Sequence, residues 1–309
     1  MNVSAKKAVW MALVSLAACS KPSDTPSQGE ITITADESLQ PMVNDLCKAY
    51  EGVNPKAKFN VLYQPEQQAI GTMLQNGSRM VFSTRELNKE EKGLLNQKQL
   101  KVKTQFIATD GIALIVGQAN KDSLMTTAQL ADIFQGKITR WEQLKGATSK
   151  GPIVLVFDNN SSSNLLYMLN RFKINDLKQL KIFTVKSNKQ VIDYVKKTPL
   201  ALGFIGVNWI SDGDVPLTAE LSKDLRVLGV SEKANPTSIS DYYQPFQKNL
   251  GLEYYPFRRK VYIISREAHS GLGGGMMTYI ARDVGGLIIE KSGLWPAIPY
   301  NREIYLQKR

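Results

Sequence analysis

Short segments with two different hydrophobic periods alternate along most of the chain. Ile31–Thr34 and Lys58–Tyr63 alternate apolar and polar residues, which is the period of a half-buried strand, whereas Leu39–Tyr50 has the spacing of an amphipathic helix. Ile112–Val116 and Ile153–Phe157 are apolar at every position, as is typical of strands buried on both faces. Strands and helices in alternation predict an α/β fold.

The same rhythm continues to the C-terminus. Further strands are predicted at residues 80–83, 201–207, 225–230 and 260–265. Further helices are predicted at residues 67–75, 89–96, 165–172, 190–197, 276–282 and 287–291, together with one that follows Thr127 and that Gly136 ends. Gly285 and Gly286 are expected to separate the last two helices.

Residues 1–18 have the composition of a secretory signal peptide. Lys6 and Lys7 precede the largely apolar run 8–18, which is shorter than the roughly 20 residues that span a bilayer as a helix. Leu16–Cys19 resembles the lipobox of bacterial lipoproteins, which implies that Cys19 becomes the first mature residue and carries a lipid. A plain signal peptide with a coincidental cysteine is the alternative.

Residues 19–29 are rich in Ser and Pro and are expected to form a flexible tether after the modified cysteine. The folded part is expected to begin at about Glu30, and its length is sufficient for two lobes. No later segment is long and apolar enough to suggest a membrane span.

The chain is basic, with 39 Lys and Arg against 28 Asp and Glu and a formal net charge of +11. Such a balance is compatible with nucleic acid, acidic membrane surfaces or small anions as partners, but export argues against a role in nucleic-acid binding. The basic residues are dispersed, so most are expected to lie on the solvated surface. Cys47 has no partner once Cys19 is modified, and it falls on the apolar stripe of a predicted helix. A buried, inert thiol is therefore expected.

Two segments share the order strand, polar loop, helix. Ala35–Ser38 precedes the first predicted helix, and Asp158–Asn164 precedes the helix that starts at Leu165. Helix N-termini bind anions, and ligands of open α/β sheets collect at the carboxyl ends of strands. The two loops therefore predict an oxyanion site. The alternative is that Ser38, Ser163 or Asn164 only caps its helix.

Several longer motifs resemble those of the phosphate-binding proteins of ABC importers. The resemblance is carried by Asp110–Val116, Leu130–Ile138, Trp141, Ile205–Val207, Tyr255–Arg259, Val261–Ile263 and Gly293–Pro296. It implies a two-lobed type II periplasmic-binding fold with a ligand cleft between the lobes. The first lobe is expected to comprise residues 30–109 and 262–309, and the second residues 110–261, with hinge crossings between them.

The resemblance also implies a set of ligand-binding residues. Ser38, followed by Leu39, matches the hydroxyl of the first family loop, and Ser161, Ser162, Ser163 and Asn164 occupy the place of the second. Gln64 lies where the family has another small polar loop.

Two charged positions depart from the family pattern. In the family, a buried Asp occupies the position of Arg79 or a position next to it. The family also has an Arg near the position that Asp158 occupies in this sequence. These charges therefore look exchanged between the lobes, which leads to the hypothesis that Arg79 pairs with Asp158. Glu66 would repel phosphate unless it is protonated or paired with an Arg.

Other functions have less support in the sequence. A hydrolase normally needs a base beside its nucleophile, and His269 is the only histidine and lies in a Gly-rich loop. The sequence holds no nucleophile elbow, P-loop or His/Cys cluster, so neither catalysis nor a cofactor or metal is expected. A scaffold reused as a sensor, adhesin or assembly partner is the remaining alternative.

The predicted function is reversible capture of phosphate or a related small oxyanion. The predicted partners are an ABC permease and a membrane, reached through the lipid on Cys19. The protein is expected to be monomeric, in the cell envelope, facing the periplasm or the cell exterior.

Overall fold

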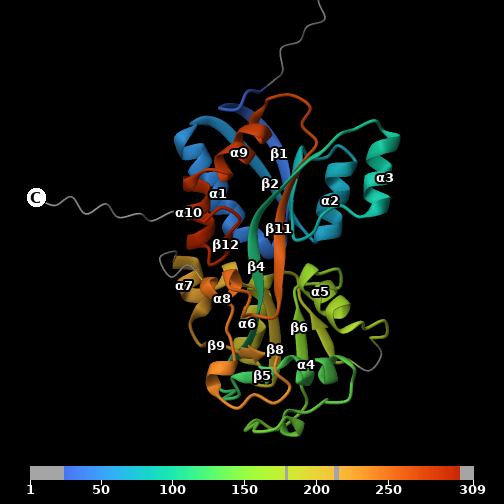
Figure 1. The fold of residues 1–309 in the computed structure, drawn as a ribbon, viewed down its shortest axis with the longest axis vertical. Helices are drawn as coiled ribbons and strands as arrows, with labels where there is room; N and C mark the ends of the chain where they lie inside the picture. The colour runs from blue at the N-terminus through green and yellow to red at the C-terminus, as the bar shows by residue number, and fades with distance from the viewer. Residues whose placement is uncertain (1–23, 178–179, 212–215, 300–309) are drawn as a thin grey trace, which may run out of the picture.

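The computed structural model describes residues 24–177, 180–211 and 216–299. Two α/β lobes are stacked along the long axis of the molecule (Figure 1), as the sequence predicts. The predicted signal peptide and the lipidated Cys19 lie outside the described residues.

The sheet of lobe 1 has the strand order β2-β1-β3-β11-β4, with β12 on the side of β4. Strand β1 pairs in parallel with β2 and β3, whereas β11 is antiparallel to β3 and β4. The bounds are Gln28–Asp36 for β1, Lys56–Gln64 for β2, Met80–Ser83 for β3, Lys103–Gly117 for β4, Arg258–Ser265 for β11 and Trp295–Pro296 for β12.

The sheet of lobe 2 continues from β4 through β8, β6 and β7, and β9 also pairs with β4. A small separate sheet joins β5 to β10. The bounds are Leu124–Thr126 for β5, Val154–Phe157 for β6, Ile182–Thr184 for β7, Ala201–Gly206 for β8, Leu225–Val227 for β9 and Gly229–Ser231 for β10.

Helices cover both faces of the lobe 1 sheet, with α1, α9 and α10 on one side and α2 and α3 on the other (Figure 1). Their bounds are Gln40–Val53 for α1, Glu66–Leu74 for α2, Lys89–Gln97 for α3, Leu272–Ile280 for α9 and Asp283–Lys291 for α10. The helices between α3 and α9 in the chain are Thr127–Phe134 for α4, Ser163–Phe172 for α5, Asn188–Lys197 for α6, Pro216–Ser222 for α7 and Gln247–Gly251 for α8. Short 3-10 turns lie at Glu37–Leu39, Trp141–Gln143, Val207–Trp209 and Ile239–Asp241.

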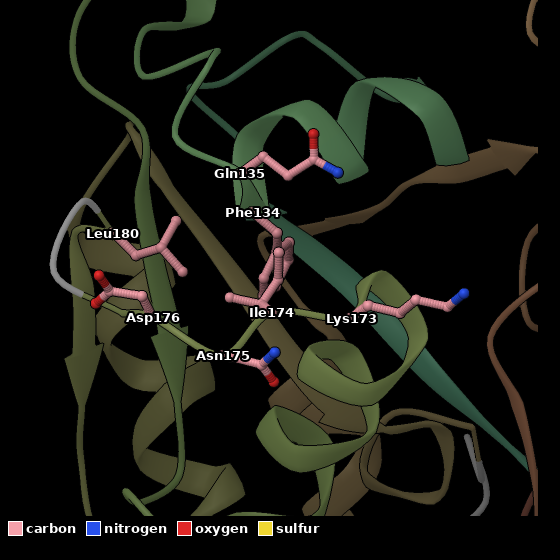
Figure 2. Close-up of a pocket in the computed structure, with 7 residues that line it drawn as sticks. All are labelled: Phe134, Gln135, Lys173, Ile174, Asn175, Asp176 and Leu180. Carbon is pink, nitrogen blue, oxygen red and sulfur yellow. The ribbon is translucent and has the colours of Figure 1, made fainter.

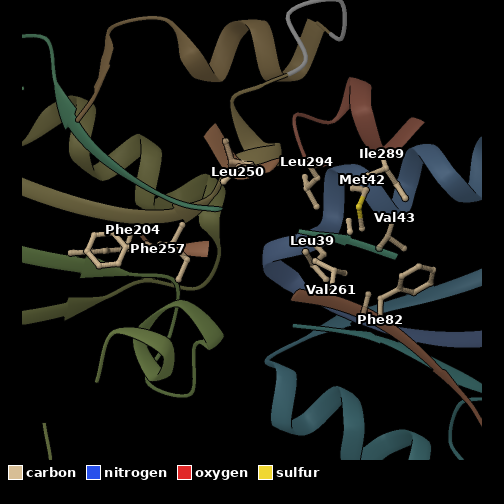
Figure 3. Close-up of a cluster of buried hydrophobic side chains, with 14 of the residues drawn as sticks. Leu39, Met42, Val43, Phe82, Phe204, Leu250, Phe257, Val261, Ile289 and Leu294 are labelled. Carbon is tan, nitrogen blue, oxygen red and sulfur yellow. The ribbon is translucent and has the colours of Figure 1, made fainter. Parts of the chain in front are cut away.

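Strand β4 runs through both lobes. It pairs with β11 as far as Gly111 and with β8 from Ile112 onward. The labelled side chains of Figure 3 accordingly fall into two groups, with Leu39, Phe82 and Val261 in one lobe and Phe204 in the other. The boundary between the lobes therefore lies at the end of β1 and in the middle of β4.

Three sequence expectations are corrected by the structure. Asp24 is 2% exposed and Gln28 already belongs to β1, so the predicted flexible tether does not extend to residue 29. Gly285 lies inside α10 rather than between two helices, and a Cβ there would approach Ile280 Cα of α9 to 2.4 Å, so this glycine allows α10 to pack closely on the end of α9. The predicted strand 225–230 is two strands, since β9 pairs with β4 and β10 with β5.

Other local predictions are confirmed. Gly136 has a φ of +72° just after α4, a backbone conformation that favours glycine at the end of a helix. Cys47 is a free, buried cysteine in α1, and burial raises the pKa of its thiol.

Candidate functional site

Arg259 is a buried arginine at the boundary between the lobes. It lies in β11 on the same face as Val261 and Ile263, and the whole residue is 5% exposed. Its cross-strand neighbour is Asp110 of β4, and Arg259 Nε donates a hydrogen bond of 2.8 Å to Asp110 Oδ2. The ion pair with this carboxylate compensates the cost of burying a guanidinium.

The two terminal nitrogens of the guanidinium contact both predicted loops. Arg259 Nη2 donates to Ser38 Oγ at 2.8 Å, and Arg259 Nη1 donates to Ser163 Oγ at 2.9 Å. Ser38 belongs to the turn after β1 in lobe 1, and Ser163 is the first residue of α5 in lobe 2. The two hydroxyl oxygens lie 3.4 Å apart. One arginine therefore joins a hydroxyl from each lobe.

Ser38 is fixed from both sides. Its backbone N–H and its hydroxyl both donate to the carboxyl of Asp36, at 3.3 and 3.0 Å. Its carbonyl oxygen accepts from Asn208 Nδ2 at 2.8 Å and from Trp209 Nε1 at 3.1 Å. The side chain of Ser38 is thus held toward Arg259 without exposure to solvent.

In the second loop, Ser162 is the N-cap of α5 and accepts from the backbone N–H of Leu165 at 3.3 Å. Its hydroxyl donates to Asp158 Oδ1, to which Asn164 Nδ2 also donates at 3.4 Å. Asn164 Oδ1 is buried and has no hydrogen-bond partner among the described residues. Ser161 is exposed, and its N–H donates to Asn159 Oδ1 at 2.7 Å.

Several buried carboxyl groups surround this single arginine. Burial, with a smaller contribution from Glu66, raises the pKa of Asp36 to about 7. Burial, together with the nearby Asp158, raises the pKa of Glu37 to about 8. The pKa values of Asp110 and Asp158 are also raised by burial, against the hydrogen bonds that stabilise their charged forms. The site can therefore hold protons near neutral pH, which reduces its repulsion of an anion.

The structure brings some predicted ligand residues together and leaves others elsewhere. Ser38, Ser163 and the loop around Asp158 meet at the lobe boundary. Leu39 is fully buried in the hydrophobic core. Gln64 is engaged within lobe 1, where its Oε1 accepts from Thr72 Oγ1 at 3.0 Å.

The hypothesis that Arg79 pairs with Asp158 is wrong. Arg79 Nη1 lies 2.6 Å from Asp24 Oδ1 and 3.6 Å from Glu267 Oε2. The reason is strand direction: Arg79 directly precedes β3, so it lies at the N-terminal end of that strand, and its N–H donates to the carbonyl of Thr32 in the middle of the parallel strand β1. The ligand loops follow the carboxyl ends of their strands, so Arg79 lies at the far end of the sheet.

Glu66 was expected to repel phosphate unless it is protonated or paired with an arginine. The structure shows the pairing with an arginine. Arg85 Nε lies 3.3 Å from Glu66 Oε2. Glu66 Oε1 also accepts from Ser83 Oγ at 2.9 Å and from the N–H of Thr84 at 2.6 Å. Its charge is therefore compensated within lobe 1.

Solvent reaches the edge of the lobe boundary. A hollow of about 230 Å³ is lined by Pro65, Gln67 and Gln68 from lobe 1 and by Ser161 from lobe 2. A separate hollow of about 240 Å³ in lobe 2, lined by Phe134 and Lys173 among others, adjoins the opposite end of α5 (Figure 2). It is therefore not part of the oxyanion site.

Two further features bear on function. Over residues 24–177, 180–211 and 216–299, no cluster of three or more His, Cys, Asp or Glu side chains could hold a metal ion. Within the same ranges, no helix has both the length and the apolar character needed to cross a bilayer.

Comparison with known proteins gives one family match and several relatives. The model of the PBP superfamily domain matches residues 20–284. A stretch of 120 residues is 33% identical to Phosphate-binding protein PstS 2 of Streptococcus agalactiae, and it covers 38% of each chain. Phosphate-binding protein PstS of Borreliella burgdorferi is 23% identical over 273 residues, 85% of this chain and 88% of the relative.

Solved structures show the same fold. A putative phosphate ABC transporter substrate-binding protein from Clostridium perfringens, solved with bound phosphate, superposes with a TM-score of 0.72 at 20% identity and covers 87% of this chain and 100% of that one. An ABC-type phosphate transport receptor from Vibrio cholerae gives a TM-score of 0.61 at 22% identity, with the same coverage.

Proposed function

Because the chain belongs to the PBP superfamily, we propose that it is a solute-binding protein that captures phosphate or a related small oxyanion for an ABC importer. One observation carries this proposal: Arg259 donates to a hydroxyl of each lobe, at 2.8 Å to Ser38 and 2.9 Å to Ser163. An anion bound there would contact both lobes and favour their closed arrangement.

The chemistry of these groups suits a tetrahedral oxyanion. A guanidinium offers planar, paired donors that match phosphate oxygens. Ser38 and Ser163 add two hydroxyl donors, and the N-terminus of α5 adds a partial positive charge behind Ser163. An entering oxyanion would accept the hydrogen bonds that Arg259 Nη1 and Nη2 donate to Ser163 and Ser38 in this structure.

Buried acceptors favour an oxyanion that carries a proton. Asn164 Oδ1 is buried without a partner among the described residues, and the carboxyl of Asp36 accepts from Ser38. Monohydrogen and dihydrogen phosphate can donate to such acceptors, whereas sulfate cannot at neutral pH. Phosphate is therefore the favoured ligand, and the names of the relatives support this choice.

Capture would be reversible and would include no chemical step. Opening of the lobes would admit the solute, and closure would present a surface for a membrane permease to recognise. We further propose that the lipid on Cys19 anchors the monomeric protein to a membrane in the cell envelope, where it faces the periplasm or the cell exterior.

A second candidate function is a scaffold that binds a protein partner rather than a solute. The buried carboxyl groups around Arg259 favour this function. A phosphate bound beside Arg259 would lie close to Asp36, Asp110 and Asp158, which repel it when they are ionised. A protein that acts only as a sensor, adhesin or assembly partner would fold normally and bind no oxyanion.

Titration calorimetry on ligand-stripped protein, with phosphate, sulfate and phosphonates, separates the two functions. The proposed function predicts phosphate binding in the micromolar range or tighter, lost in Arg259→Gln and weakened in Ser163→Ala, with Ser161→Ala as the matched control. Absence of heat with every oxyanion, from protein shown to be folded, would favour the scaffold.

A further inference from the structure

A second set of contacts joins the lobes beside the oxyanion site. Glu37, in the turn after β1, accepts from the backbone N–H of Asn188 through both carboxyl oxygens, at 3.1 Å each. Glu37 Oε2 also accepts from Asn188 Nδ2. The two residues are 151 positions apart in sequence and are 8% and 0% exposed.

Asn188 is held in place by its own lobe. It is the first residue of α6, and its Oδ1 accepts from the N–H of Gly206 at 3.2 Å and from Asn164 Nδ2 at 3.1 Å. Its two donors are therefore fixed before Glu37 approaches. Because lobe 2 orients these donors, little conformational freedom is lost when the lobes close over them.

The partner that lobe 1 supplies is itself a carboxyl group. Glu37 lies at the N-terminus of the ten-residue helix α6, where an acceptor or negative charge is stabilised by free N–H groups. Closure at this point thus needs no solute, since a carboxyl group of the protein itself accepts these hydrogen bonds.

We propose that Glu37 and Asn188 form a clasp that holds the lobes closed before any solute binds. This inference rests on the proposed function and makes Glu37 a positioning residue for ligand capture. Ser38 and Ser163 are 0% and 4% exposed in the closed arrangement, and Arg259 is 5% exposed. A solute can reach them only when the clasp has opened.

The clasp has a kinetic signature. Loss of its hydrogen bonds shifts the equilibrium between closed and open lobes by about 10- to 100-fold toward the open form. Because the open form admits and releases solute, association becomes faster and dissociation becomes faster still, so that net affinity falls. Loss of a residue that only contacts the ligand would weaken binding without faster association.

The first measurement is the distance between the lobes in ligand-stripped full-length protein. Spin labels on Lys92→Cys and Lys137→Cys, both exposed ion-pair lysines, report on lobe 1 and lobe 2. A Cys19→Ser background leaves only the buried Cys47, which takes no label. A single short distance is expected, with a population of longer distances in Glu37→Ala and in Asn188→Ala.

Matched variants make this result specific. Glu37→Gln retains an acceptor for Asn188 and should restore part of the short population. Glu30→Ala removes a carboxylate that accepts from Asn60 Nδ2 within lobe 1, and it should change nothing. An unchanged distance distribution in folded Glu37→Ala, or in Asn188→Ala if the former does not fold, would overturn the clasp.

The second measurement is stopped-flow binding of inorganic phosphate. Glu37→Ala should associate several-fold faster than the parent and bind about tenfold more weakly. Slower or equal association with weaker binding would assign Glu37 to direct ligand contact and overturn the clasp. If the parent binds no phosphate, the proposed function fails, whereas the label distances still decide whether the clasp exists.

Discussion

The guanidinium of Arg259 and the carboxylate of Asp110 form an ion pair in which neither side chain is more than 3% exposed. The two residues face each other across antiparallel strands β11 and β4. Asp110 Oδ2 lies 2.8 Å from both Nε and Nη2 of Arg259, and this contact orients the guanidinium so that Nη2 also donates to Ser38 and Nη1 donates to Ser163. The direction of these donors, rather than charge alone, defines the oxyanion site.

Replacement of Arg259 by Lys tests this conclusion. An ammonium cannot donate to Asp110, Ser38 and Ser163 in the planar arrangement of a guanidinium, so phosphate affinity should fall by at least about 100-fold. Arg259→Met leaves Asp110 buried and unpaired, and the free energy of unfolding should fall by about 3–5 kcal/mol. Calorimetric titration and urea unfolding give the two quantities. Phosphate affinity of Arg259→Lys within threefold of the parent would contradict the assignment.

The adjacent serines of the second loop should have different roles. Ser163 contacts Arg259, so Ser163→Ala should weaken phosphate binding by about tenfold or more and, because it leaves a buried donor of Arg259 unpaired, lower the free energy of unfolding by about 1–3 kcal/mol. Ser162 caps α5, so Ser162→Ala should lower the free energy of unfolding by about 1–2 kcal/mol. The exposed Ser161→Ala is the control for both. Equal affinity losses for Ser162→Ala and Ser163→Ala would show that this division is wrong.

Arg79 should contribute to stability and not to binding. Arg79→Ala removes the ion pair to the buried Asp24, which keeps its hydrogen bond from the N–H of Leu272. The free energy of unfolding should fall by about 1–2 kcal/mol, whereas phosphate affinity should stay within twofold of the parent. Arg140→Ala, which breaks an exposed ion pair, should change stability by less than about 1 kcal/mol. A large loss of affinity in Arg79→Ala would return this residue to the site.

The buried carboxyl groups predict that stability falls as pH rises. The folded-state pKa values of Asp36 and Glu37, about 7 and about 8, exceed the ordinary values of 3.8 and 4.5. Between the ordinary and the raised pKa values the folded protein binds more protons than the unfolded chain, so folding is favoured at the lower pH. Urea unfolding of ligand-free protein should show lower stability at pH 8.5 than at pH 5.

Two variants test which groups cause this slope. Glu37→Gln and Asp36→Asn each remove one titrating group and should each flatten the decrease in stability between pH 5 and pH 8.5. A parent protein that becomes more stable over this interval would show that both carboxyl groups are ionised in the folded state.

Both ligand loops could be predicted from the sequence, because each is marked by a pattern of neighbouring residues. In each, polar residues follow an apolar strand and precede an amphipathic helix, and Ser38 and Ser163 do lie at the lobe boundary. The alternation of Arg259 with Val261 and Ile263 was also visible. A charged residue on the apolar face of a strand needs a buried partner, so this signal could have identified Arg259, which directly precedes the predicted strand 260–265.

Other features depend on contacts that sequence spacing does not encode. Arg79 was predicted as a ligand because it stands at or beside the place of a buried Asp in the family pattern, whereas its partners Asp24 and Glu267 come from distant parts of the chain. The partnership of Glu37 with Asn188 joins residues of different lobes, and neither residue carries a local mark of it. The extension of ordered structure back to Asp24 likewise depends on Arg79 and α9, which are distant in sequence.

The continuity of β4 determines how the lobes can move. Its 15 residues pair with β11 in lobe 1 and with β8 in lobe 2, and Ile112 N–H still donates to Phe257 where the sheets meet. A register slip is excluded, because a shift of one residue would turn the buried face of the strand outward. Any motion between the lobes must therefore twist this hydrogen-bonded ribbon rather than slide one strand past another.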